Sequence, residues 1–485
     1  MSYESIPTII SGVSAAEKQI IGQTAKGTHI EASIVPGGAG TVVLAGGLSG
    51  KDASSATVEK LAQDYETRAD HPYQLIAIPV ANPDAAKLAF PPTGVAYKEN
   101  TESHVLWRWL GVHAPDLVLI AGLDSGLAAA LSSNPVALMG RIPAQPVGAT
   151  LPQTVAESEA HHQLTARMKR FPIGTANGLS AFYGHDLSQI SYINALGLIA
   201  QLRLGDLLGV KIAAEPWVNG SKDPLARPNS TALPAFLLFA ELAERTGDQR
   251  YLALVRKAAN LGFTDSGEMK ESMPYHDEMS DSVFMGTPLL ARAGKLTGER
   301  RYYDMAERHL LFMQRLDERG DGLYRHTPLT EAAWGRGNGF PALGLALTLS
   351  DMPREHRAWS GMLLEYQHHM EALSHHQDRD GMWHEVIDEP GSYAEFTATA
   401  MIGFSMMRGI RNVWLDRAAW QPIVDKAWAA INARIDVDGR LVDVCESTGK
   451  MKNLAEYLNR TAILDRDARG GAMAMLFATE MAGLK

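Results

Sequence analysis

The segment that decides the fold of most of this chain is Leu233-Pro-Ala-Phe-Leu-Leu-Phe-Ala-Glu-Leu-Ala-Glu-Arg-Thr-Gly-Asp-Gln-Arg-Tyr251. Its apolar residues recur at i, i+3, i+4 and i+7, the spacing of one helical face: Leu233, Phe236, Leu237 and Ala240. Gly247 can adopt the left-handed conformation that ends a helix. Asp248 can then cap the next helix by accepting its free N–H groups. The segment therefore predicts two antiparallel helices joined by a short turn.

The same break recurs along the chain. Thr297-Gly-Glu-Arg-Arg-Tyr302 follows 51 residues later, and Ser350-Asp-Met-Pro353 follows 53 residues after that. Asp-Gly turn signals at 321, 380 and 438 interleave with these breaks at intervals of 59 and 58 residues. We expect helical hairpins near 188–215, 232–262, 287–317, 341–374 and 397–433, and a last helix at 469–482.

Hairpins of this size bury a continuous core only by stacking on one another. Their number predicts an all-α (α/α)6 toroid over residues 180–485. An open α-solenoid is the alternative, because the period alone does not separate the two.

Residues 1–165 have a different pattern. Short apolar runs at 41–47, 73–80 and 116–122 end in Gly or Pro, and helical stretches at 53–68 and 102–110 lie between them. Buried strands that alternate with helices predict an N-terminal α/β domain with a doubly wound sheet. The segment 141–163 is rich in Pro, Ala and Gln, and we expect it to be a linker.

Composition narrows the classes of function. The single cysteine, Cys445, excludes an intrachain disulfide and fits a reducing compartment. The N-terminus carries no signal-peptide pattern, and no apolar run approaches the roughly 18 residues of a membrane span, so we expect a cytoplasmic protein without a membrane partner. The net charge is −10 and no basic stripe is visible, which argues against a nucleic-acid partner.

Asp281 is the leading candidate for catalysis. It directly precedes an apolar helix start, and other carboxylates, Asp277 among them, stand nearby. Burial beside like charges suits a carboxyl group to general-acid work. The structural alternative is that Asp281 merely caps the helix.

Two further clusters offer groups that bind sugars. In Trp334-Gly-Arg-Gly-Asn-Gly-Phe340, the Trp gives a flat face, Arg336 a fork for a carboxylate and Asn338 an amide. Trp383 and His384 follow an Asp-Gly turn, and Glu395, whose alternative role is a helix cap, precedes a helix of small residues.

We expect no metal and no cofactor. The acidic residues around Asp380 loosely match the spacing of a calcium-binding loop. Trp383, however, stands where the tight turn of such a loop needs Gly, so we do not expect calcium to bind there. Neighbours on a helix point about 100° apart and rarely chelate one ion. We therefore expect the adjacent histidines to be solvated: His161-His162, His368-His369 and His375-His376.

In this order, the clusters resemble glycoside hydrolase family 105, the unsaturated rhamnogalacturonyl hydrolases, and more distantly the unsaturated glucuronyl hydrolases of family 88. Four motifs over residues 180–485 carry the resemblance: Asp281-Ser-Val-Phe-Met285 with Pro288; Trp334 to Phe340; Gly381-Met-Trp383 with Pro390-Gly-Ser-Tyr393, Glu395 and Thr397 to Met401; and Ser447-Thr-Gly449 with Tyr457, Arg460 and Gly470-Gly-Ala472.

The resemblance implies a toroid whose catalytic acid/base is Asp281. It implies a partner, an oligosaccharide that ends in a uronate with a C4=C5 double bond, which the Asp hydrates after protonating C4. The residues that it and the clusters assign to substrate binding are Trp334, Arg336, Asn338, His326, Trp383, His384, Glu395 and Asp277. The oligomeric state stays open.

The sequence also departs from that family. Where a second acidic residue is usual, the chain reads Arg227-Pro-Asn-Ser-Thr231, and Asp186 is a candidate substitute. Three alternatives therefore stay open. They are a hydrolase of saturated β-uronosides with two carboxylates, an epimerase-like toroid with His326 and His384 facing each other, and a sugar-binding protein without turnover.

The N-terminal domain faintly resembles zinc carboxypeptidases at Gly46-Gly-Leu-Ser-Gly-Lys-Asp52. Ser49 and Asp52 stand where those enzymes have the His and Glu that bind zinc. Without imidazole ligands a zinc site is not expected, and the pattern predicts a non-catalytic module.

Overall fold

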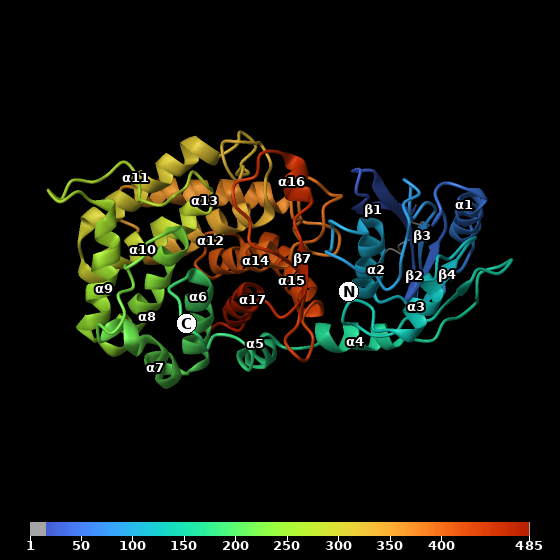
Figure 1. Cartoon of the computed structure of the whole chain (residues 1–485), viewed down its shortest axis with the longest axis horizontal. Helices are drawn as coiled ribbons and strands as arrows, with labels where there is room; N and C mark the ends of the chain where they lie inside the picture. The colour runs from blue at the N-terminus through green and yellow to red at the C-terminus, as the bar shows by residue number, and fades with distance from the viewer. Residues whose placement is uncertain (1–15, 485) are drawn as a thin grey trace, which may run out of the picture. The chain divides into compact units, whose positions relative to one another are not determined.

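The computed structural model describes residues 16–484, which form two compact units (Figure 1). The first comprises residues 16–94 and 99–164, and the second comprises 95–98 and 165–484. Among these residues, no helix combines the length and the apolar character that crossing a membrane requires.

A five-stranded sheet forms the centre of the first unit. Its strands are β1 (Glu17–Gln23), β2 (His29–Ala45), β3 (Tyr73–Ile78), β4 (Leu117–Ile120) and β5 (Ala144–Pro146). β3 and β4 both pair in parallel with β2, β5 pairs in parallel with β4, and β1 runs antiparallel to the first part of β2. The helices are α1 (Ala53–Glu66), α2 (Thr101–His113), α3 (Leu127–Ser133) and the start of α4 (Glu159–Met168).

Successive residues of β2 explain why this sheet needs cover on both faces. Val42 and Leu44 pack with Val58 of α1, whereas Val43 and Ala45 point to the opposite face and are equally buried. A strand with two buried faces is typical of parallel sheets between helical layers. The predicted α/β unit is therefore present.

Three details of the first unit differ from the predictions or refine them. The linker expected at 141–163 is wrong, because β5 and the first turns of α4 lie within it. His161 is not simply solvated, since its Nδ1 lies 2.9 Å from Oδ1 of the buried Asp116. The carboxylate of Asp52 caps α1 by accepting the N–H of Ser54 at 2.8 Å.

The second unit is a ring of helices. Six inner helices surround its centre: α6 (Tyr192–Leu204), α8 (Phe236–Thr246), α10 (Ser282–Thr297), α12 (Gly335–Asp351), α14 (Phe396–Arg411) and α17 (Ala468–Met481). Their outer partners are α5 (Pro172–Ser180), α7 (Leu207–Val218), α9 (Gln249–Ala259), α11 (Arg300–Asp317), α13 (Trp359–Ser374) and α15 (Arg417–Ala433). Short elements complete the unit: η1 (Ser230–Ala235), η2 (Asn260–Gly262), β6 (Leu441–Cys445), α16 (Leu454–Leu458) and β7 (Ala462–Asp465).

The ring is closed. Each inner helix packs against the next, and α17 packs against both α14 and α6. The open solenoid is therefore wrong. The sixth pair joins the two ends of the unit, because α5 packs on α17.

The predicted turn chemistry is confirmed between α8 and α9. Gly247 has a φ of 71°, and Asp248 accepts the N–H of Arg250 at 2.9 Å. A side chain at the Gly247 φ would strain the backbone.

Ion pairs link three of the inner helices, α6, α14 and α17, near their C-terminal ends. Glu480 of α17 is fully buried and lies 2.5 Å from Arg408, 2.9 Å from Arg411 and 3.4 Å from Arg203. Cations stabilise the negative ends of helix dipoles. The opposite end of the ring gathers the N-termini of the inner helices, whose positive dipole ends attract anions.

Candidate active site

A cavity of about 300 Å³ lies among the N-terminal ends of the inner helices. Its lining residues come from five of the inner helices or the segments just before them and from the loop after β6: Tyr192, Asn229, Ser230, Thr231, Asp277, Met279, Asp281, Met285, Trp334, Arg336, Phe340, Ser447, Thr448 and Arg469. Asp281 and the Trp334 loop, far apart in sequence, thus share one pocket.

Asp281 lines this cavity with a carboxylate that does not cap its helix. The residue stands directly before α10, but its backbone is already helical (φ −48°, ψ −32°), and its side chain makes no capping hydrogen bond. The capping alternative is therefore wrong. Oδ1 is buried without a hydrogen-bond partner and lies 3.4 Å from Nε2 of His326.

His326 supports Asp281 from the protein interior. The ring is fully buried, its Nδ1 lies 2.7 Å from the hydroxyl of Tyr457, and it packs 4.4 Å from the Trp334 ring. The Tyr457 hydroxyl in turn accepts the N–H of Met451 at 3.3 Å. His326 therefore contacts the candidate acid and does not itself line the cavity.

Trp334 and Arg336 form a stacked pair in the cavity wall. The guanidinium lies 4.6 Å from the Trp334 ring and donates to the carbonyls of Cys445 at 3.0 Å and Glu446 at 2.7 Å. Main-chain carbonyls thus accept hydrogen bonds from both terminal nitrogens of the Arg336 guanidinium. A Cβ on Gly335 would lie 2.4 Å from the carbonyl oxygen of His384, so this close packing requires glycine.

A buried carboxyl group holds Trp334 from behind. Oε1 of Glu385 accepts the indole N–H at 2.9 Å and also faces the thiol of Cys445 at 3.2 Å. Burial, reinforced by the charge of nearby Glu395, raises the pKa of Glu385 to about 8. The group is therefore mostly protonated at neutral pH.

Besides His326, four residues expected to bind substrate do not line the cavity. Asn338 is buried and exchanges two hydrogen bonds of 2.8 Å with the main chain of Tyr324. Trp383 is also buried and donates to the carbonyl of Leu373 at 2.7 Å.

His384 and Glu395 are likewise engaged elsewhere. Nε2 of His384 lies 3.1 Å from Asp378, and its Nδ1 lies 2.6 Å from the carbonyl of Ser392. Glu395 caps α14 by accepting the N–H of Ala398. The His326–His384 pairing of an epimerase-like site is thus not formed.

Several lining residues were not among the predicted site residues. Arg469, in the first turn of α17, donates to the carbonyl of Cys445 at 3.0 Å, and its buried Nε has no hydrogen-bond partner. Arg469 directly precedes the Gly470-Gly-Ala472 motif, and this position is the feature of the sequence that could have identified it as a site residue. Asn229 lines the cavity where a second acid was expected, whereas Asp186 binds Ser188 and Asn194 elsewhere. Within residues 16–484, Asp281 and Asp277 are the carboxylates that line the cavity.

Known proteins share this architecture. The sequence profile of Glycosyl Hydrolase Family 88 matches residues 215–485, more than half of the chain. The Unsaturated rhamnogalacturonyl hydrolase YesR of Bacillus subtilis (strain 168) is 26% identical over 248 residues, which is 47% of this chain and 70% of that protein. The Unsaturated 3S-rhamnoglycuronyl hydrolases of Formosa agariphila and Alteromonas sp. are 28% and 25% identical, and the matches cover 33% and 50% of this chain and 48% and 63% of those proteins.

Solved structures show the same fold. A possible member of the GH105 family from Salmonella enterica serovar Paratyphi A superposes with a TM-score of 0.54 at 21% identity, over 69% of this chain and 96% of that one. A family 105 glycoside hydrolase from C. acetobutylicum gives 0.55 at 18% identity, over 65% and 100%. The closed helical ring and the profile match over residues 215–485 agree, and the chain belongs to Glycosyl Hydrolase Family 88, which confirms the prediction of a glycoside hydrolase.

Proposed function

We propose that the protein hydrolyses oligosaccharides that end in a 4,5-unsaturated uronate, and that Asp281 is the acid and base of the reaction. One observation carries the proposal: Asp281 lines the cavity between the inner helices, and its carboxylate does not cap α10. The names of the three relatives, all hydrolases of unsaturated sugars, support the same substrate class.

Arg469 is the group best placed to receive the uronate carboxylate. It lines the cavity, its buried Nε has no hydrogen-bond partner, and it stands in the first turn of α17, where the helix dipole also favours an anion. Arg336 adds positive charge, although its N–H groups are largely engaged by the main chain. Trp334 is buried and packs against both Arg336 and His326, so it holds these two groups at the cavity wall.

The chemistry needs one carboxyl group. Protonated Asp281 donates its proton to C4 of the enol ether, and positive charge develops at C5 and the ring oxygen. Water adds to C5 while the Asp281 carboxylate accepts its proton. The resulting hemiketal opens at the C5–O5 bond, O5 becomes the hydroxyl of a hemiacetal at C1, and this hemiacetal expels the rest of the oligosaccharide. Asp281 ends protonated, as it began.

Asn229 supports a mechanism with one carboxylate. Its Oδ1 accepts the N–H of Ala232 at 3.0 Å and caps η1, so it is held as a neutral cavity group. An amide cannot serve as the second acid or base that hydrolysis of a saturated glycoside requires.

Asp277 supports a second candidate function. It lines the same cavity as Asp281, so two carboxylates face one substrate space. That arrangement fits a hydrolase of saturated β-uronosides, which would release an intact uronic acid.

The product separates the two functions. Fragments from a polysaccharide lyase should lose the ultraviolet absorbance of the conjugated double bond, and in D₂O the product should carry deuterium at C4. Unchanged absorbance across pectin, ulvan and glycosaminoglycan fragments contradicts the first proposal. Release of intact glucuronate from a saturated substrate, lost in Asp277→Asn, establishes the second.

A further inference from the structure

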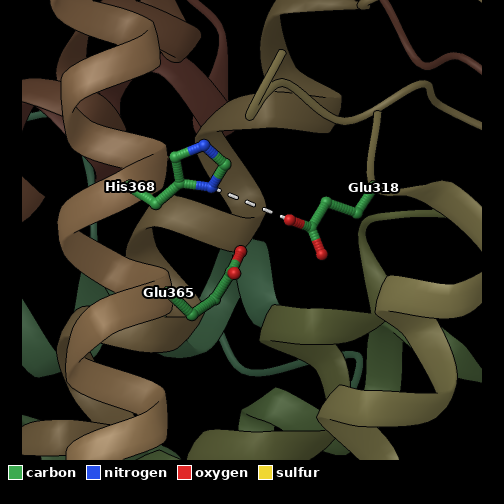
Figure 2. Close-up of side chains that lie close together, drawn as sticks. All are labelled: Glu318, Glu365 and His368. Atoms are coloured by element: carbon green, nitrogen blue, oxygen red, sulfur yellow. Dashed lines mark ion pairs between the residues drawn. The ribbon is translucent and has the colours of Figure 1, made fainter. Parts of the chain in front are cut away.

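A second cluster of ligand-type side chains lies on the outer layer of the ring. It consists of Glu318, directly after α11, and of Glu365 and His368 on α13 (Figure 2). One ligand atom from each of the three lies within 4.8 Å of the other two, and His368 Nδ1 is 3.8 Å from Glu318 Oε1. Glu365 and His368 are three residues apart on one helix and so share a face.

Residues outside the trio hold both carboxylates in place. The Tyr324 hydroxyl donates to Oε1 of Glu365 at 2.6 Å, and the Gln314 amide donates to Oε2 of Glu318 at 3.1 Å. Each carboxylate thus has one oxygen held by a hydrogen bond from a residue outside the trio. Hydrogen bonds of this kind orient metal ligands and tune their basicity.

Among the described residues, the two carboxylates of the cluster are balanced only by the His368 imidazole, which lies 3.8 Å from Glu318 and is charged only when protonated. Neither Glu318 nor Glu365 ion-pairs with an arginine or lysine among residues 16–484. Two partly buried carboxylates that face each other in this way are stabilised by a bound cation.

We propose that Glu318, Glu365 and His368 bind a divalent metal ion of the zinc type, which joins the end of α11 to the middle of α13. An imidazole with two carboxylates suits Zn²⁺, whereas Mg²⁺ and Ca²⁺ prefer oxygen ligands alone. Donors around a tetrahedral zinc ion lie roughly 3.3 Å apart, so the trio needs only small side-chain rotations.

Access to the site is open. The His368 side chain is 53% exposed, and Gln314, Glu365 and His368 are part of the lining of a surface groove of about 380 Å³, which Glu318 does not line. The groove leaves space for a water molecule to complete the coordination. Three protein ligands and one open position satisfy the coordination number of zinc.

The site is also tied to the loop beside the cavity. Tyr324, which fixes Glu365, exchanges its main-chain hydrogen bonds with Asn338 and stands two residues before His326. A metal at Glu365 would therefore stabilise the segment that leads to the partner of Asp281. This proposal concerns binding and stability, and its outcome does not depend on the substrate of the cavity.

Zinc chloride titrated into the full-length protein by calorimetry tests the site. We expect one Zn²⁺ per chain, and a thermal midpoint that rises with zinc concentration because the ion binds the folded state. His368→Ala and Glu365→Gln should each weaken binding by about tenfold or more and abolish the rise, while their metal-free midpoints show that both fold.

His375→Ala is the matched control. Its imidazole is exposed near the C-terminal end of the same helix and lies 3.4 Å from a single carboxylate, that of Glu371. We expect the control to bind zinc as the parent protein does. The proposal is overturned if the parent binds no stoichiometric zinc, if His368→Ala binds as tightly as the parent, or if Ca²⁺ binds as well as Zn²⁺.

Discussion

Nε2 of His326 lies 3.4 Å from Oδ1 of Asp281, and Nδ1 of the same ring lies 2.7 Å from the hydroxyl of Tyr457. Three segments that are distant in sequence thereby meet at one carboxylate in the cavity wall. The loops between the helical hairpins set the direction of Asp281, because no capping hydrogen bond restrains it.

Replacement of two aspartates by alanine separates catalysis from helix capping. Asp281→Ala should lower kcat by about 10³-fold or more and change the free energy of unfolding by less than the roughly 1 kcal/mol of a lost helix cap, because its side chain makes no capping hydrogen bond. Asp416→Ala is the control, because Asp416 caps α15 by accepting the N–H of Ala419 at 2.9 Å. It should cost about 1 kcal/mol and leave kcat unchanged. Turnover assays and urea unfolding measure both, and the reverse pattern would make Asp281 a structural residue.

Tyr457→Phe tests the hydrogen bond that orients His326. In the tautomer that accepts the Tyr457 proton at Nδ1, the ring carries its own proton on Nε2, toward Asp281. Loss of the hydroxyl frees the ring to change tautomer, so we expect kcat to fall about tenfold with little change in KM. The pH dependence of kcat should shift as well, which a purely structural role would not produce. Tyr366→Phe is the control, because its buried hydroxyl binds the carbonyl of Ser405 away from the cavity.

Arg469→Gln tests the binding of the uronate carboxylate. A charge-assisted hydrogen bond contributes about 1.5–3 kcal/mol, so KM should rise about tenfold to a hundredfold while the variant stays folded. Arg417→Gln, an exposed change on α15, should leave KM as it is. An unchanged KM in Arg469→Gln would assign the carboxylate to another group.

Most helical hairpins of the ring could be predicted from the sequence, because the residues within each turn determine where one helix ends and the next begins. Gly247 and Asp248 act as predicted through backbone conformation and a capping hydrogen bond. The sixth hairpin was not readable, because α5 and α17 come from opposite ends of the unit and meet only when the ring closes.

Side-chain direction was the harder part of the site. Trp383 and His384 belong to a loop whose main chain bridges to Ala394 and, at Val386, to Trp334, and that pairing turns their side chains away from the cavity. Adjacent histidines were expected to be solvated, yet His369 is buried and bound to the carbonyls of Gly322 and Asn338, while His368 is exposed. Neighbours on a helix point in different directions, which places one of the pair inside and the other outside.

Glu480→Gln tests the closure of the ring. Burial alone would raise the pKa of Glu480, but Arg408, Arg203 and Arg411 hold it below its ordinary value. Loss of the charge leaves these buried cations uncompensated and should cost about 3–5 kcal/mol of unfolding free energy, measured in urea. Glu371→Gln, an exposed change on α13, should alter stability little. Equal stabilities would mean that packing alone closes the ring.

Glu385→Gln tests whether the buried carboxyl group that binds the Trp334 indole makes the stability of the protein depend on pH. In the unfolded chain a glutamate loses its proton near its ordinary pKa of 4.5, whereas burial raises the pKa of Glu385 in the folded protein to about 8. Between these values the folded state binds more protons, so its stability falls as pH rises, by up to about 1.4 kcal/mol per pH unit. A glutamine stays neutral, and its amide oxygen can still accept the Trp334 N–H. The variant should therefore gain thermal stability over the parent progressively from about pH 5 to about pH 8, as measured by calorimetry. Glu371→Gln should show no such trend, and a constant difference between Glu385→Gln and the parent would mean that Glu385 is already ionised in the folded protein.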